Sequence, residues 1–259
     1  MLLDFWLDQP VSIILALIVV FFLATGSLIH LLVFSRWTGR LFGSLSLVAP
    51  FFTAIALLFG LLTGFLASDA WERNRLAGRA VVAERDVVLA IHALSIATLS
   101  DMTAIRSALR NYATLVVSEE WVRMEDGDVG PQTSAALTEL LRELADPKSS
   151  HQSGLVAHSA LLDLGIRLVA ARGDRLSLAG QRSSHAKWWT VIGLAVLTQL
   201  AIALVHAGKA TTGLVAVGLF SLAAVLSLSL IATSERPFDG ATGIKPVAMR
   251  AALEAMAPP

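Results

Sequence analysis

Residues 11–34 of the chain read VSIILALIVVFFLATGSLIHLLVF, a run of 24 residues without a formal charge. A helix of this length is about 36 Å long, which is enough to cross the hydrocarbon core of a bilayer. The preceding MLLDFWLDQP is acidic and no A-x-A site follows the run, so a cleaved signal peptide is disfavoured. The stretch therefore predicts a first transmembrane span that stays in the mature protein.

Three further apolar segments without formal charge predict three more spans, at about 44–67, 188–205 and 212–233. The whole chain is 55% hydrophobic and 15% charged, with a mean hydropathy of +0.69. Soluble domains contain roughly 45–50% apolar and 25% charged residues. The sequence thus predicts an all-α integral membrane protein with four transmembrane helices.

Positive charge near the span ends predicts the orientation. The short loops at 35–43 and 206–211 hold three Lys or Arg residues, whereas the termini and the long middle segment hold eleven near span ends. Because basic residues favour the cytoplasmic side, we expect a multi-pass membrane protein with both termini cytoplasmic. The expected organisation is a transmembrane pair, a cytoplasmic helical domain, a second transmembrane pair and a cytoplasmic tail, at residues 1–67, 68–187, 188–234 and 235–259.

The middle segment is expected to be helical, because Ala and Leu abound and no sustained alternation of β-branched residues occurs. Span two is predicted to continue as one long helix, followed by helices at about 101–124, at 132–145 and from about 154. Residues 68–187 contain 14 Lys or Arg and 15 Asp or Glu, a net charge of 14 − 15 = −1. Such a balance argues against nucleic acid as a partner.

Enzyme chemistry is disfavoured by what the sequence lacks. There is no cysteine, the six histidines follow no metal-binding spacing such as H-E-x-x-H, and no G-x-S-x-G occurs. We therefore predict no catalytic residue, no metal site and no cofactor. The spans also lack Asp, Glu, Lys and Arg, which coupled transporters usually need.

Span two carries two patterns with different interpretations. Gly60 and Gly64 form a G-x-x-x-G spacing, which predicts a close helix–helix contact. Bulky apolar residues on the same span favour a hydrophobic constriction that gates an oligomeric pore by dewetting; the candidates are Phe52, Phe59, Leu62 and Leu66. Side chains that face lipid would show the same pattern, so both readings stay open.

Basic residues flank spans two and three and predict a collar at the membrane surface. Such a collar anchors lipid headgroups, or it forms a vestibule that concentrates anions. The residues concerned are Arg73, Arg75, Arg79, Arg172 and Arg175.

Four stretches in order, GFLASDAWERNRLAGRAVVAE, LRNYATLVVSEEW, RGDRLSLAG and ERPFDG with a following IKP, resemble a bacterial family of four-span membrane proteins described as bestrophin-like. The resemblance implies the topology of bestrophins, which are pentameric, anion-selective channels with helical cytoplasmic regions. Its motif residues here are Trp71, Tyr112, Glu120, Trp121, Arg236, Pro237, Phe238 and Gly240. In calcium-gated bestrophins an acidic cluster follows the Pro-Phe-Gly segment, whereas ATGIKP follows here, so no calcium clasp is expected.

Together these features predict a homo-oligomeric ion channel in the lipid bilayer, selective for anions such as chloride and lined by span two. The resemblance makes a pentamer the expected assembly, an anion the permeant species and the bacterial inner (cytoplasmic) membrane the expected location. The alternative is a membrane-anchored scaffold or sensor whose helical domain binds a cytoplasmic partner, with a candidate surface at Tyr112, Glu119, Glu120 and Trp121.

Overall fold

The computed structural model describes residues 11–35, 49–97, 101–125, 128–146, 154–181, 184–239 and 243–257. Within these ranges every regular element is a helix, which confirms the predicted all-α class. The chain divides into two compact units. Unit 1 comprises Met1–Glu72 and Arg182–Glu235, and unit 2 comprises Arg73–Gln181 and Arg236–Pro259.

Four helical segments of the described chain are long and apolar enough to cross a membrane, as the sequence predicts. The first is α2 (Val11–Phe34), which has the predicted bounds. The second begins α4 (Ala49–Ala97), a single helix of 49 residues that continues past the predicted span as expected. The third and fourth are α10 (His185–Val205) and α11 (Ala210–Thr233).

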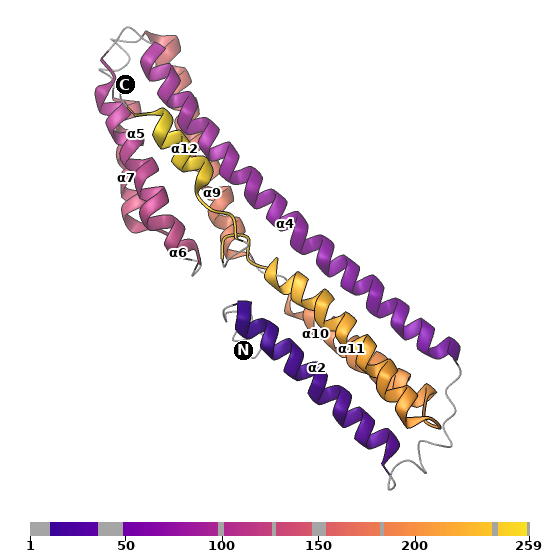
Figure 1. Ribbon diagram of the computed structural model, residues 1–259. Coiled ribbons are helices and arrows are strands. Elements are labelled where there is room, and N and C mark those ends of the chain that lie inside the picture. Colours follow the sequence, from indigo (N-terminus) through magenta and orange to yellow (C-terminus); the bar gives the residue numbers. More distant parts are fainter. Residues whose placement is uncertain are drawn as a thin grey trace. The chain divides into compact units, whose positions relative to one another are not determined.

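Helices α2, α10 and α11 pack side by side as the core of unit 1 (Figure 1). Apolar residues such as Ile18, Phe22 and Leu228 fill their interface, and α4 joins them through Phe59 and Leu66. Much of the remaining surface of these helices is exposed apolar side chain, which is the composition expected of segments in contact with lipid.

A polar cluster ties three of the membrane helices together at Gln199 of α10, which is fully buried. Its Nε2 donates to Ser221 Oγ of α11 at 2.8 Å and to the Phe22 carbonyl of α2 at 3.3 Å. Its Oε1 accepts from the Thr25 hydroxyl of α2 at 2.9 Å. Buried amides of this kind link transmembrane helices, because an unsatisfied polar group in hydrocarbon is costly.

Unit 2 packs helices around one apolar core. They are the second part of α4, α5 (Thr103–Leu115), the π-helical turn η1 (Val116–Glu120), α6 (Trp121–Glu125), α7 (Pro131–Ala145), α9 (Leu155–Gly180) and α12 (Val247–Ala255). Fully buried side chains include Leu109, Leu140, Leu161 and Met249. Two features differ from the prediction: the helix expected over 101–124 contains a π turn, and α12 was not expected.

Candidate functional site

Helix α4 has two opposite faces along its length. Its buried side chains recur every three or four residues from Phe59 to Ala70, and buried positions resume at Ala77. The other side starts with large apolar groups, because Leu57, Leu61 and Phe65 are 70%, 51% and 59% exposed. We call the exposed side of the apolar part of α4 the open face; it comprises Leu57, Leu61, Gly64, Phe65 and Ser68.

The residues predicted to form a constriction lie on the buried side of α4. Phe59 is 9% exposed, and its ring lies 5.3 Å from the Phe220 ring of α11 in an edge-to-face arrangement. Leu66 is 1% exposed, and Phe52 and Leu62 are partly buried against the same membrane helices. These side chains therefore pack within the chain, on the side of α4 opposite the open face.

Gly60 and Gly64, predicted to allow a close helix contact, both lie at exposed positions. A Cβ atom added to either glycine would meet no atom within 4 Å in the described chain. No described helix of this copy therefore packs on them, and their small size leaves room beside the open face.

The expected basic collar divides into exposed and buried residues. Arg75 and Arg79 are exposed on α4, and Arg73 is partly buried. Arg172 and Arg175 are 8% and 0% exposed. The charges of these last two do not face solvent as expected, because carboxylates within unit 2 neutralise them.

Arg175 is the centre of a buried charge network. Its guanidinium donates to both carboxylate oxygens of Glu84 on α4 and, through Nη2, to Glu120 Oε2 at 2.6 Å. All three side chains are fully buried. Burial lowers the pKa of Arg175, but the charges of Glu84 and Glu120 outweigh it and hold that pKa above its ordinary value. The residue stays cationic and joins α9 to α4 and η1.

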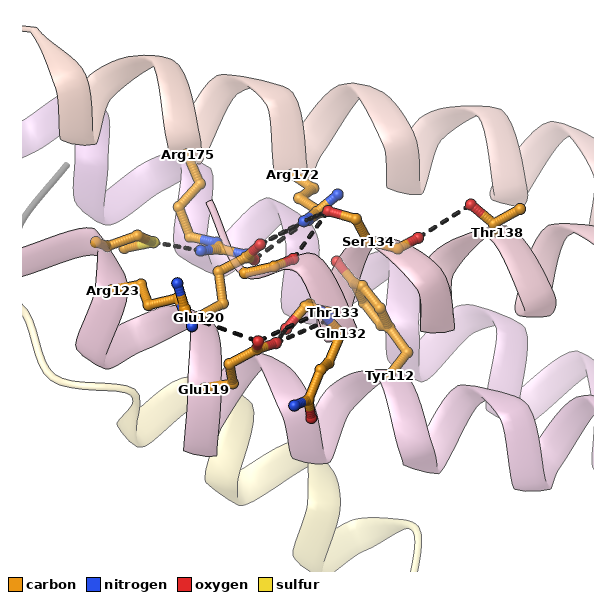
Figure 2. A network of polar contacts seen from close by, with 12 residues as sticks. Tyr112, Glu119, Glu120, Arg123, Gln132, Thr133, Ser134, Thr138, Arg172 and Arg175 are labelled. Carbon is orange, nitrogen blue, oxygen red and sulfur yellow. Dashed lines mark hydrogen bonds and ion pairs between the residues drawn. The ribbon is translucent and has the colours of Figure 1, made fainter. Parts of the chain in front are cut away.

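Arg172 completes this network one turn earlier on α9. Its Nε donates to the two oxygens of Glu120 at 3.1 and 3.2 Å, and its Nη2 donates to the same carboxylate and to Ser134 Oγ of α7 at 2.8 Å. Figure 2 shows both arginines reaching from α9 toward Glu120. Two carboxylates and two guanidinium groups give a formally neutral cluster, which makes its burial tolerable.

The Tyr112 hydroxyl donates to Glu84 Oε1 and closes the network on the α5 side. Burial of the phenol, together with the negative charge of Glu84, raises the pKa of Tyr112 well above its ordinary value. Tyr112 therefore remains a neutral hydrogen-bond donor at any physiological pH. The network thus connects α4, α5, η1, α7 and α9.

The π turn explains how Glu120 and Trp121 both reach the interior. The Trp121 backbone N–H donates to the Val116 carbonyl five residues earlier, one residue more than in an α-helix. In an uninterrupted α-helix, positions five apart point about 140° away from each other. The extra residue instead turns Trp121 back over buried Val116, and π turns of this kind often occur at functional sites.

Trp121 holds the segment that follows the last membrane helix. Its indole Nε1 donates to the Ile244 carbonyl at 3.1 Å, and its ring meets the Phe238 ring edge-on at 5.7 Å. The Arg175 guanidinium lies 5.5 Å from the centre of the same indole, within cation–π range. Since Arg110 also donates to the Met256 carbonyl at 2.6 Å, both ends of this segment are fixed to unit 2.

The surface expected to recruit a partner in the scaffold alternative lies mostly inside unit 2. Tyr112 and Glu120 are fully buried and Trp121 is 4% exposed. Only Glu119 of that set reaches solvent, and its carboxylate is already engaged by α7. The prediction that these residues form a partner-binding surface is therefore wrong, because Tyr112, Glu120 and Trp121 lie in the core of the domain.

Glu119 caps α7, which starts twelve residues later. Its Oε2 accepts from the Thr133 backbone N–H at 2.8 Å and from the Thr133 hydroxyl at 2.9 Å, and its Oε1 accepts from the Gln132 N–H at 3.3 Å. Those are first-turn amides of α7, which otherwise lack acceptors. Partial burial raises the pKa of Glu119, but these bonds and the Arg123 charge outweigh it, so the pKa is lowered.

We expect Glu119→Gln to lower the melting temperature at pH 7 and the loss to disappear in acid. A carboxyl whose pKa is lowered in the folded state stabilises the fold above its unfolded value, about 4.3 for glutamate. That contribution is lost as the pH falls through the lower folded pKa. Thermal unfolding in detergent between pH 7 and 3 measures it, with Glu139→Gln, whose side chain is 49% exposed, as the control. A difference from wild type that stays constant down to pH 3 would contradict this role.

Comparison with known proteins identifies the family. A family model described as a bestrophin-like domain matches residues 20–249. The chain belongs to the bestrophin-like family. No curated protein matches the sequence.

Solved structures share the fold of this bestrophin-like protein. A bacterial bestrophin homologue from Klebsiella pneumoniae with one leucine-to-threonine substitution is 16% identical with a TM-score of 0.67, over 92% of this chain and 97% of that one. A second structure of the homologue, phased on zinc, gives 16% identity and a TM-score of 0.65 over 92% and 96%. A proline-to-alanine variant of a membrane protein gives 17% and 0.68 over 92% and 96%.

The four motif stretches of the bestrophin-like protein meet at the buried network. Glu84 ends the first stretch, Glu120 and Trp121 end the second, and Arg175 belongs to the third. The fourth contributes Phe238, which is 2% exposed against Trp121. Sequence reasoning missed Glu84 as a member, because a lone glutamate on a long helix looks like a surface residue.

Other motif residues lie beside the network or away from it. Trp71 is 53% exposed on α4 and takes no part in it. Arg236 donates to Asp239 at 2.6 Å, and the Pro237 carbonyl accepts from the Ile244 N–H at 2.7 Å, so both shape the turn after α11. Gly240 lies outside the described residues. Within the described ranges no group of three or more His, Asp or Glu side chains can hold a metal ion.

Proposed function

We propose that this bestrophin-like protein is an oligomeric, anion-selective channel in which the open face of α4 lines the passage. One observation carries the proposal: Leu57, Leu61 and Phe65 are large, exposed and spaced four residues apart, while the opposite side of α4 is buried. Helix α4 also continues beyond this apolar part without a break as far as Ala97.

The chemistry of the open face suits a hydrophobic constriction. A ring of leucine and phenylalanine side chains from several copies resists wetting and gates ion flow without a fixed charge. Arg75 and Arg79 follow later in the same helix, where both are exposed. Cationic groups at the mouth of an apolar passage favour anions over cations.

A passage lined by the open face of α4 requires self-association. Each chain contributes one open face, so enclosing a passage needs several copies arranged around an axis. A pentamer agrees with the family resemblance. The balance of basic residues supports a cytoplasmic location for unit 2, in the inner membrane of a bacterium.

Chloride efflux from liposomes tests the proposal. We expect Leu61→Ala to raise efflux about three-fold or more over wild type, because a smaller side chain widens the constriction and eases its wetting. The matched control is Leu219→Ala on α11, which removes a leucine that is 64% exposed and not on α4. Empty vesicles give the background rate.

Two results would count against the channel. Equal efflux from wild type and both variants would mean that Leu61 does not border the passage. If folded oligomers release chloride only at the background rate at every pH and calcium concentration tested, the protein is not a chloride channel. Such silence would favour a scaffold, although its partner surface would have to lie outside the buried network.

A further inference from the structure

A groove of about 240 Å³ runs between α2 and α11 on the surface of unit 1. Its floor is formed by Phe22, Val217 and Ser221, which are all buried. Large apolar side chains form its two rims; they are Val19 and Leu23 of α2 and Leu214 and Leu222 of α11. None of the described residues that line the groove is charged. The groove is therefore an apolar site with a closed floor and an open top.

Small residues on both helices make the groove. Gly26 of α2 is buried, and a Cβ atom there would lie 3.4 Å from both Gln199 Nε2 and Val217 Cγ1, so the glycine lets α2 approach its neighbours closely. Gly218 of α11 is exposed, and a Cβ atom there would meet nothing within 4 Å in the described chain. Ser27 of α2 also lines the groove. The helices thus meet at the floor, while short side chains leave the space above it empty.

The groove has the width of one hydrocarbon chain. On α2 its lining residues extend from Val19 to Ser27, which is about 12 Å along the helix axis. Over that length its volume corresponds to a cross-section of about 20 Å², or a width of about 4.5 Å. Carbon atoms in van der Waals contact lie about 3.5–4.0 Å apart, so an extended methylene chain fits between the rims. Pockets for drug-sized ligands are larger, at about 300–1,000 Å³.

The surroundings of the groove decide which molecule can fill it. Helices α2 and α11 are two of the four segments able to cross a membrane, and the rim residues Leu23 and Leu222 are 62% and 57% exposed. Hydrocarbon contains no water to fill the groove, and an empty groove would leave its walls without van der Waals partners. We propose that the groove is a binding site for one acyl chain of a membrane phospholipid.

A bound chain would cover the polar cluster of the membrane helices. Ser221 on the groove floor accepts from Gln199 Nε2 at 2.8 Å and donates to the Val217 carbonyl at 2.6 Å. Hydrogen bonds of this kind are strongest where water cannot compete for them. The acyl chain therefore completes the apolar cover of the cluster at the place where it borders the groove.

A phospholipid with a photoreactive diazirine in the middle of one acyl chain tests the site in liposomes that hold the full-length protein. After illumination, mass spectrometry of tryptic peptides locates the cross-links, and cleavage after Lys209 separates α10 from α11. We expect Leu23 and Leu222 to be labelled several-fold more than Leu197 of α10. Leu197 is a suitable reference because it is 50% exposed and lies outside the groove.

Gly218→Leu should lower labelling of the groove at least about five-fold, because a close-packed leucine and an acyl chain cannot occupy the same space. Labelling of Leu197 should not change. The control is Gly193→Leu, which adds the same side chain at an exposed glycine of α10 where a Cβ atom also meets nothing within 4 Å, and it should leave the groove labelled. Ser27→Leu should act as Gly218→Leu does, from the α2 side.

Three results would overturn the site. Labelling of Leu23 and Leu222 no stronger than that of Leu197, a comparison that needs no variant, would show only ordinary contact with the bilayer. Unchanged groove labelling in folded Gly218→Leu and Ser27→Leu would mean that no chain occupies the groove. A groove that escapes the label while Leu197 reacts would indicate that another copy of the chain covers it. Because labelling does not depend on conduction, none of these results decides whether the protein is a channel.

Discussion

Replacing Arg175 with alanine is expected to destabilise unit 2 by about 3–5 kcal/mol, the usual cost of removing one partner from a buried ion pair. Glu84 and Glu120 would both lose a donor while remaining buried. Arg172 can still bind Glu120, but Glu84 would keep only the Tyr112 hydroxyl among the contacts of the network. The buried Glu84 carboxylate, left without its cationic partner, is the main cause of the expected loss of stability.

Thermal unfolding in detergent, followed by circular dichroism, measures this effect. The control is Arg142→Ala, which removes a surface arginine that is 70% exposed and paired with Glu139. Exposed pairs contribute about 0–1 kcal/mol, so that variant should melt close to wild type. Arg175→Lys should fall between them, because an ammonium lacks the planar fork that binds two carboxylates at once. Equal melting of the two alanine variants would show that the network contributes no stability.

The second large effect is expected for Trp121→Ala. Removing a buried tryptophan typically costs about 3–5 kcal/mol through lost packing and the cavity left behind. Here the change also removes the hydrogen bond to the Ile244 carbonyl and the edge contact with Phe238. We therefore expect the segment from 243 to 257 to detach before the rest of unit 2 unfolds.

Limited proteolysis detects this release, because trypsin cuts after Arg250 within the segment. Trp121→Ala should be cleaved there several-fold faster than wild type. Trp121→Phe keeps an aromatic ring and loses only the indole donor, worth about 1 kcal/mol, so its cleavage should rise much less. If both variants resist trypsin as wild type does, the tryptophan is not what holds the segment.

The membrane helices were predictable because lipid imposes a simple rule on sequence. A helix that spans hydrocarbon needs about 20 apolar residues, and α2 shows this run with the bounds 11–34. The same apolar composition gives no information on which side of each membrane helix faces the protein interior. Span two is apolar on all sides, so its sequence contains no period that separates buried Phe59 from exposed Leu61.

The buried network was not predictable from local pattern. Arg172 and Arg175 look like collar residues, since their charge is visible in the sequence but their burial is not. Arg175 pairs with Glu84, which is 91 positions away, and only the fold brings them together. The residues that the family resemblance selected, including Glu120 and Trp121, did converge there.

The π turn had no signature in the sequence either. LRNYATLVVSEEW reads as an ordinary helix, and the extra residue becomes visible only when Val116, Glu120 and Trp121 are all found buried. Helix α12 was missed for a different reason. It has only nine residues, and short helices are stabilised by packing more than by their own propensity.

Glu119 and Glu120 are neighbours in this turn, yet they hold different helices. Glu119 accepts from the first amides of α7, and Glu120 accepts from the arginines of α9. Opening the turn would withdraw both carboxylates at once, so neither helix can lose its support alone. Proteins unfold locally in cooperative units. Here the five residues of η1 place α7 and α9 in the same cooperative unit.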